Sequence, residues 1–95
     1  MIIINLKLPI KYMLSKCSLD NRCRFIELLI DKNTIQSYVY GGCSHICQIT
    51  DPFILKTIYN SLDNRLKDGS AYSVEISLNN YYKTGSYSYK IKKIN

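Results

Sequence analysis

The chain has 95 residues, a formal net charge of +6 at pH 7 and a hydrophobic content of 46%. This length predicts a single domain over residues 1–95, and the spread of Ile, Leu, Val and Phe excludes a disordered protein. No apolar run reaches the roughly 18 residues of a transmembrane helix, and no signal-peptide pattern is present. We therefore expect a cytoplasmic protein that does not enter a membrane.

The first ten residues alternate between apolar and other side chains. Four apolar residues occupy every second position: Ile2, Ile4, Leu6 and Leu8. This period of two predicts a strand with one face in the core. Pro9 marks the end of this strand or an edge position, because proline cannot donate to a strand ladder. Residues 11–22 contain several loop formers, and we expect them to be irregular.

Residues 24–30 fit either a helix or a strand. A hairpin is favoured because Asp31-Lys32-Asn33-Thr34 is a good tight turn and β-forming residues follow at 35–40. Gly41-Gly42 then breaks the second strand, and residues 43–49 predict another short one.

The clearest helix is predicted at about 52–67. Thr50 or Asp51 can cap its amino terminus, and Pro52 fits the first helical position. Gly69 suits the left-handed residue that follows a helix. Five residues follow the helical period and should form its buried stripe: Leu55, Ile58, Tyr59, Leu62 and Leu66.

Two alternating segments, 71–78 and 86–92, predict a long hairpin that closes the chain. The expected fold is α+β, with one mostly antiparallel sheet of five or six strands and a single helix, at about 52–67, packed on one face.

The last quarter of the chain concentrates tyrosine and lysine. No acidic residue follows Glu75. On the final strand Lys90 and Lys92 alternate with Tyr87 and Tyr89, so the lysines should face solvent and the tyrosines lie partly on the core side. The hairpin tip adds exposed aromatic rings and another cation. The predicted binding residues are Tyr81, Tyr82, Lys83, Lys90, Lys92 and Lys93.

Five residues are weak candidates for a metal site: Cys17, Cys23, Cys43, His45 and Cys47. Their spacing differs from that of standard zinc fingers, and an extended strand would hold Cys43 and Cys47 about 13 Å apart. We therefore assign no metal and no cofactor. Reduced, partly buried thiols are the preferred interpretation, with a zinc site or a disulfide left open.

Catalytic patterns are missing from the sequence. It has no glycine-rich phosphate loop, its seven acidic residues are scattered, and His45 is its sole histidine. A two-metal nuclease needs clustered carboxylates, which no short segment supplies. We predict that the protein is not an enzyme.

Charge and size together favour a small basic binding protein. Its partner is expected to be an acidic or nucleic-acid-binding protein, or nucleic acid itself. Abundant Ile, Lys, Asn and Tyr, which have AT-rich codons, suggest an AT-rich organism or one of its viruses as the source. Together with the small size and the uneven positive charge, this favours a viral or mobile-element-type inhibitor that occupies an anionic or nucleic-acid-binding surface of a host defence complex.

Two alternatives remain open. The protein could bind single-stranded nucleic acid directly, through a lysine and serine face of the sheet and the tyrosine tip. It could instead be a zinc-stabilised or oligomeric structural module, with a homodimer formed through an edge strand.

Overall fold

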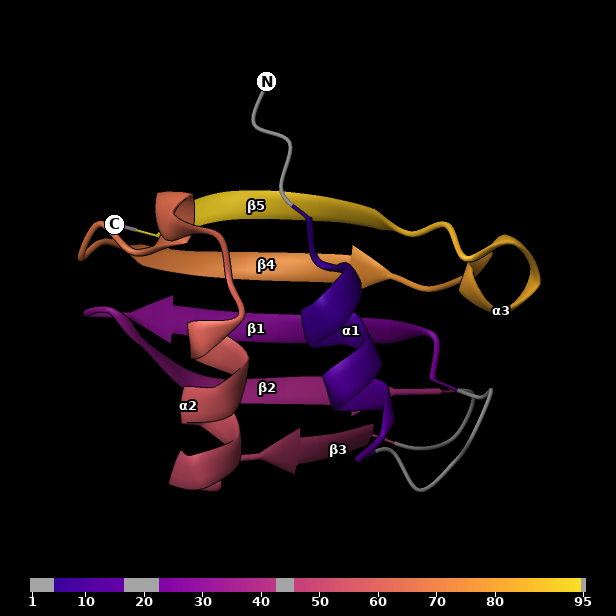
Figure 1. Cartoon of the computed structure of the whole chain (residues 1–95), viewed down its shortest axis with the longest axis horizontal. Helices are drawn as coiled ribbons and strands as arrows, with labels where there is room; N and C mark the ends of the chain where they lie inside the picture. Colours follow the sequence, from indigo (N-terminus) through magenta and orange to yellow (C-terminus); the bar gives the residue numbers. More distant parts are fainter. Residues whose placement is uncertain (1–4, 17–22, 43–45, 95) are drawn as a thin grey trace.

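The computed structural model describes residues 5–16, 23–42 and 46–94, which form one antiparallel sheet with helices on one face (Figure 1). The strands are β1 (Phe25–Asp31), β2 (Thr34–Gly41), β3 (Ile46–Ile49), β4 (Ala71–Ser77) and β5 (Ser88–Ile94). Their order is β3-β2-β1-β4-β5. The helices are α1 (Lys7–Leu14), α2 (Pro52–Asn60), α3 (Tyr81–Thr84) and the 3-10 turn η1 (Asn64–Leu66). The predicted α+β fold with one antiparallel sheet is confirmed, but the expectation of a single helix is wrong.

The core lies between the sheet and the helices α1 and α2, which cross the same face of the sheet (Figure 1). Side chains of a strand alternate between faces, so β1 buries Ile26, Leu28 and Ile30 and exposes the residues between them. Leu28 lies between Tyr38 of β2 and Val74 of β4, and all three are fully buried. Only this face of the sheet is covered by a described helix, and we call the other one the open face.

The hairpin of β1 and β2 is confirmed. Its turn residues Lys32 and Asn33 have φ values of 51° and 61°, as a tight two-residue hairpin turn requires. A register shift between Leu29 and Ile30 then inserts an extra residue in β2, which keeps both Ile35 and Tyr38 on the core face.

The amino-terminal strand prediction is wrong where the structure tests it. Ile2 and Ile4 lie outside the described residues, Leu6 is buried, and Leu8 is 64% exposed on α1. Pro9 fits this helix because it lies in the first turn, where a backbone N–H needs no helical acceptor. The first helical hydrogen bond runs from the Ile10 N–H to the Leu6 carbonyl, at 2.9 Å.

Helix α2 begins where the sequence predicts and ends earlier. The Asp51 carboxylate accepts hydrogen bonds from the N–H groups of Phe53 and Ile54, at 2.9 and 3.4 Å. The helix stops at Asn60, in a stretch whose Asn, Ser and Asp side chains compete for backbone hydrogen bonds. Leu62 and Leu66 still reach the core, one in the connection and one in η1. Over the described residues, no helix is long and apolar enough to cross a membrane.

Candidate functional site

The predicted tyrosine tip is α3, between β4 and β5. Tyr81 is half-buried against the core, and its ring meets the edge of the Tyr82 ring at 5.5 Å between centroids. The Tyr82 hydroxyl donates to the Cys23 carbonyl at 3.0 Å, while the residue as a whole remains 40% exposed. Lys83 is exposed beside them. Tyr81 by packing and Tyr82 by its hydrogen bond therefore hold α3 against the rest of the protein.

The three predicted lysines of β5 do not form one surface. Lys90 and Lys92 lie on the open face, and Lys93 lies on the other side because side chains alternate along a strand. Glu75 is directly opposite Lys90 on β4, and Glu27 is directly opposite Glu75 on β1. The chain after Glu75 has no acidic residue of its own, but in the sheet its strand β5 lies beside carboxylates that come from β4 and β1.

The cysteine and histidine candidates are only partly described. Cys17, Cys43 and His45 lie outside the described residues. Cys23 is buried, with its Sγ 3.5 Å from the Phe25 carbonyl oxygen, and Cys47 is half-buried on β3. Among the described residues, no three Cys, His, Asp or Glu side chains come together in a way that could hold a metal ion.

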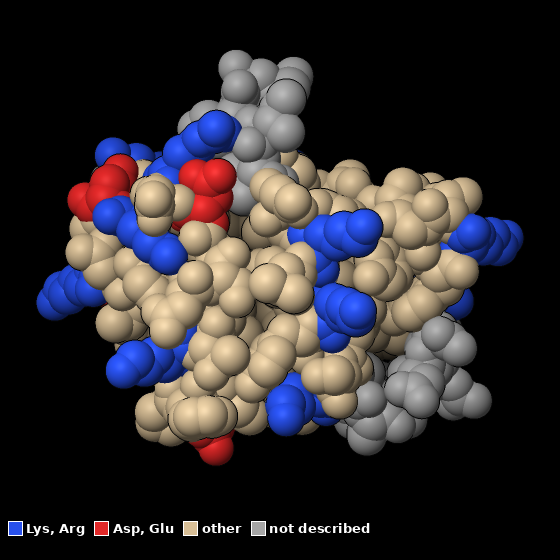
Figure 2. All heavy atoms as spheres, viewed as in Figure 1, with Lys and Arg blue, Asp and Glu red and all other residues tan. Residues whose placement is uncertain are grey.

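A cationic surface that the sequence analysis missed lies on α1. Residues 5–16 contain three lysines, at positions 7, 11 and 16, and no acidic residue. Figure 2 shows blue side chains following α1 with no red among them. Because residues four apart are neighbours on a helix, the exposed and half-exposed side chains form two ridges. One ridge is Lys7, Lys11 and Ser15, and the other is Leu8, Tyr12 and Lys16.

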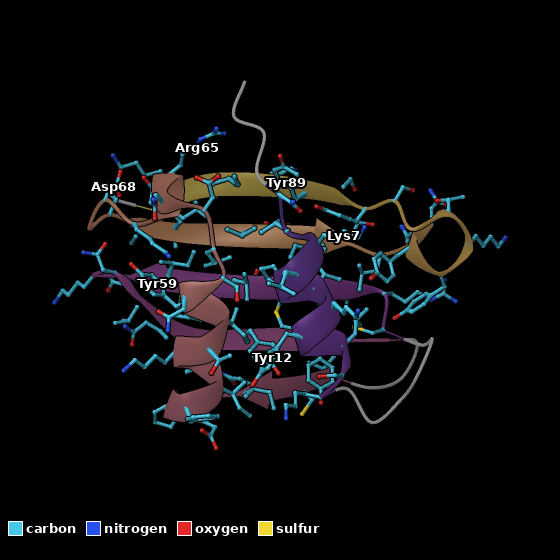
Figure 3. The ribbon with its side chains drawn as sticks, viewed as in Figure 1. Lys7, Tyr12, Tyr59, Arg65, Asp68 and Tyr89 are labelled. Carbon is cyan, nitrogen blue, oxygen red and sulfur yellow. The ribbon has the colours of Figure 1, made fainter. Side chains whose placement is uncertain are left out.

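Within this surface, which we call the α1 surface, an aromatic and an aliphatic side chain accompany the cations. Lys7 and Tyr12 both project from α1 (Figure 3). The Lys16 ammonium lies 5.6 Å from the centroid of the Tyr12 ring, within the range of a cation–π contact. Leu8, next to Lys7, is 64% exposed.

Two tyrosine hydroxyls hold α1 at its ends. The Tyr87 hydroxyl accepts the Leu6 N–H at 2.9 Å, and the Tyr40 hydroxyl donates to the Lys16 carbonyl at 3.3 Å. Ile10 and Met13 fill the space beneath the helix and are fully buried. The helix is short, and its position comes from this packing rather than from intrinsic helix stability.

The α1 surface was accessible to sequence reasoning. Leu6, Ile10 and Met13 follow the helical spacing i, i+4, i+7, and on that spacing Lys7 and Lys11 fall on the opposite face. The alternation at the start of the chain and Pro9 favoured a strand instead.

The open face carries both signs of charge and a shallow hollow. The hollow has a volume of about 620 Å³ and runs across the middle of the sheet. Its floor is partly apolar, with Phe25 and Val39, and its polar groups include Glu27, Glu75 and Lys90.

Acidic groups elsewhere are engaged locally. The Tyr72 hydroxyl donates to Asp68 Oδ2 at 2.6 Å, which lowers the pKa of Asp68 below its usual 3.8 and raises the pKa of Tyr72 above its usual 10.0. Asp63 lies 3.6 Å from the Arg65 guanidinium. Arg65 and Asp68, one residue of each pair, lie near the start of β4 and away from Lys7 and Tyr12 of α1 (Figure 3).

Comparison of the chain with protein-family models, with curated proteins and with solved structures finds no match.

Proposed function

We propose that the protein is a non-enzymatic binding protein that occupies an acidic surface of a partner protein through α1. The single observation that carries this proposal is the α1 surface, where the described segment 5–16 has three lysines and no acidic residue and also presents the exposed Leu8. If the source is a virus or mobile element, as the codon-related composition suggests, the partner would belong to a host defence complex and the protein would act as its inhibitor.

Charge supports an anionic partner at this place. The lysines at positions 7 and 11 are one helical turn apart on an exposed ridge, and the described residues 5–16 around them include no carboxylate, so their fields add. On β5, by contrast, Glu75 is directly opposite Lys90. An anionic surface that approaches the protein is therefore attracted more strongly to α1 than to the predicted lysines of β5.

The side chains between the lysines favour a protein over nucleic acid. Protein interfaces bury apolar and aromatic anchors inside a polar, charged rim, and Leu8 and Tyr12 flanked by lysines fit that arrangement. The charged phosphates of a nucleic acid make no favourable contact with an apolar side chain such as Leu8. The tyrosine tip, which was expected to stack on bases, uses its Tyr82 hydroxyl to hold the Cys23 carbonyl.

The proposal is tested by following backbone amide shifts during titration with two probes at about 150 mM salt, where surface charges are screened within about 8 Å. One probe is a helical peptide with Glu and Leu on one face, and the other is a short single-stranded DNA. We expect the peptide to shift residues 7–16 and to bind more tightly than the DNA.

Two matched variants distinguish binding through the α1 surface from binding that depends only on the net positive charge of the protein. Lys7→Glu with Lys11→Glu should weaken peptide binding by at least about tenfold, because like-charge contacts across an interface cost several kcal/mol. Lys83→Glu with Lys92→Glu changes the net charge equally on the predicted patch and should have little effect. Tighter binding of the DNA, or a larger loss in the second variant, would overturn the proposal.

A further inference from the structure

A groove lies between the start of β2 and the helix α2. Its volume is about 520 Å³, within the range of about 300–1,000 Å³ that ligand pockets cover. One wall is the hairpin end of β2 and the other is one stripe of α2. Described residues that line it include Ile35 and Gln36 of β2, Thr50 of the connection after β3, and Leu55, Lys56 and Tyr59 of α2.

Part of β2 has no strand partner at this groove. The short strand β3 pairs with β2 only from Tyr38 onward, so residues 34–37 have no neighbour on that side among the described strands (Figure 1). In the tight hairpin, Asp31 and Thr34 form the closing pair, which exchanges backbone hydrogen bonds, and bonded and non-bonded pairs then alternate. The next residue, Ile35, therefore directs its backbone N–H and C=O away from β1 and toward the groove. Groups of this kind are those with which an added strand pairs.

The side chains around the groove fit an extended polypeptide. Ile35 is buried on the core face, whereas the neighbouring Gln36 is exposed on the open face, so the groove follows the edge of the sheet. An added strand alternates its side chains between the two faces. Every second side chain would therefore contact the helix wall, where Leu55 is buried and Tyr59 half-buried, and the others would point toward Gln36.

The charge at the groove favours an acidic side chain in the occupant. Among the described residues that line the groove, Lys56 is the only charged one, and it is exposed. The Lys67 ammonium, 4.7 Å from the centroid of the Tyr59 ring, adds a second cation nearby. A terminal carboxylate is usually captured by a cluster of backbone N–H groups, but two such groups in the first turn of α2 already donate to Asp51. The carboxylate that suits Lys56 is therefore that of an Asp or Glu side chain.

We infer that this groove binds an extended acidic segment of another protein, which pairs with residues 34–37 of β2 and places a carboxylate on Lys56. About four residues, at about 3.3 Å each, would lie along the unpaired part of the strand. An apolar side chain on the same face as the acid would contact Leu55 and Tyr59. This site is separate from the α1 surface, because its walls come from β2 and α2.

Titration of the full chain with the capped peptide acetyl-Thr-Val-Thr-Glu-Thr-amide, followed by backbone amide shifts, tests this inference. Its Val and Glu lie on the same face of an extended chain. We expect saturable shifts at residues 33–37 and 55–60, with a dissociation constant on the order of 0.5 mM because so short a peptide makes few contacts. The same peptide with methylated backbone nitrogens keeps its side chains but cannot donate to β2, and it should bind at least about tenfold more weakly.

Matched variants test the role of the charge. Lys56→Gln keeps much of the side chain but removes its cation, and it should weaken peptide binding by about threefold, which is typical of an exposed ion pair. Lys83→Gln removes the same charge from α3 and should leave binding unchanged. The variant with Lys7→Glu and Lys11→Glu should bind this peptide as the native chain does, because neither residue lines the groove.

Three results would overturn the inference. The first is the absence of saturable shifts at residues 33–37 with peptide up to about 5 mM, and the second is equal binding of the methylated peptide. The third is a set of shifts at these residues when the protein alone is concentrated, because a second copy of the chain would then occupy the groove. The proposed function is read from shifts at residues 7–16, so either result can fail without the other.

Discussion

The α1 surface and the open face of the sheet differ in how their charges arise. On α1 the lysines come from one short segment, and no described neighbour brings a carboxylate among them. On the open face Lys90 comes from a lysine-rich segment, but Glu75 and Glu27 reach it from the adjacent strands. Both regions belong to a chain of charge +6, so net charge alone does not identify the binding surface. The binding surface is identified by the side chains that lie around each cation in the folded protein.

The largest expected effect is a difference in stability between substitutions at two adjacent leucines of β1, one on each face of the sheet. Leu28 is fully buried and Leu29 is 37% exposed. Leu28→Ala should lower the free energy of unfolding by about 3 kcal/mol because it leaves a cavity, and Leu29→Ala by less than about 1 kcal/mol. Urea denaturation at a low protein concentration measures both. Equal losses would mean that the open face is covered.

A smaller effect should come from the contact that holds α1 on the sheet. Tyr87→Phe removes the acceptor of the buried Leu6 N–H and should cost about 1 kcal/mol of stability, since an unsatisfied buried donor costs about 1–3 kcal/mol. Hydrogen exchange of the α1 amides should accelerate more than that of β1. Tyr59→Phe, on α2, is the control, because the Tyr59 ring contacts Lys67 without its hydroxyl. Unchanged exchange in α1 would show that packing alone holds the helix.

Glu27→Lys should stabilise the fold by a small amount. It replaces a like-charge pair with Glu75 by an opposite-charge pair and should stabilise the monomer by about 0.5 kcal/mol. Glu27→Gln should give a smaller gain in stability. A loss of monomer stability in either variant would contradict the assigned strand register.

The smallest effect concerns the hydrogen bond between Tyr72 and Asp68. The pKa of Asp68 is lowered in the folded state, so its stabilising contribution is present above its unfolded pKa near 3.8 and is lost as pH falls through the folded pKa. The pKa of Tyr72 is raised, so its contribution is complete below its unfolded pKa of 10.0 and is lost as pH rises through the folded pKa. Tyr72→Phe should return the pKa of Asp68 toward 3.8, as a carboxyl NMR titration would show. An unchanged pKa would mean that the Ser70 N–H, which also donates to Asp68, accounts for the shift.

Local patterns in the sequence were sufficient to predict the conformation of the segments whose structure depends on residues close to them in the chain. The hairpin turn at Lys32 and Asn33, the cap at Asp51 and the pairing of β4 with β5 all follow from residues a few positions apart or from clear alternation. Hydrogen bonds within a turn or cap involve groups that the chain already holds close together, so composition and order predict them.

Tertiary structure decided between the strand and helix patterns that residues 7–14 both carry, and it alone decided the charge around the β5 lysines. The amino-terminal segment is compatible with a strand or a helix, and the outcome depends on packing of Ile10 and Met13 against the sheet and on the Tyr87 hydroxyl. Lys90 faces a glutamate because β4 pairs with β5 in one particular register. Such contacts join residues far apart in the chain, and no local pattern encodes which side chains the fold will bring together.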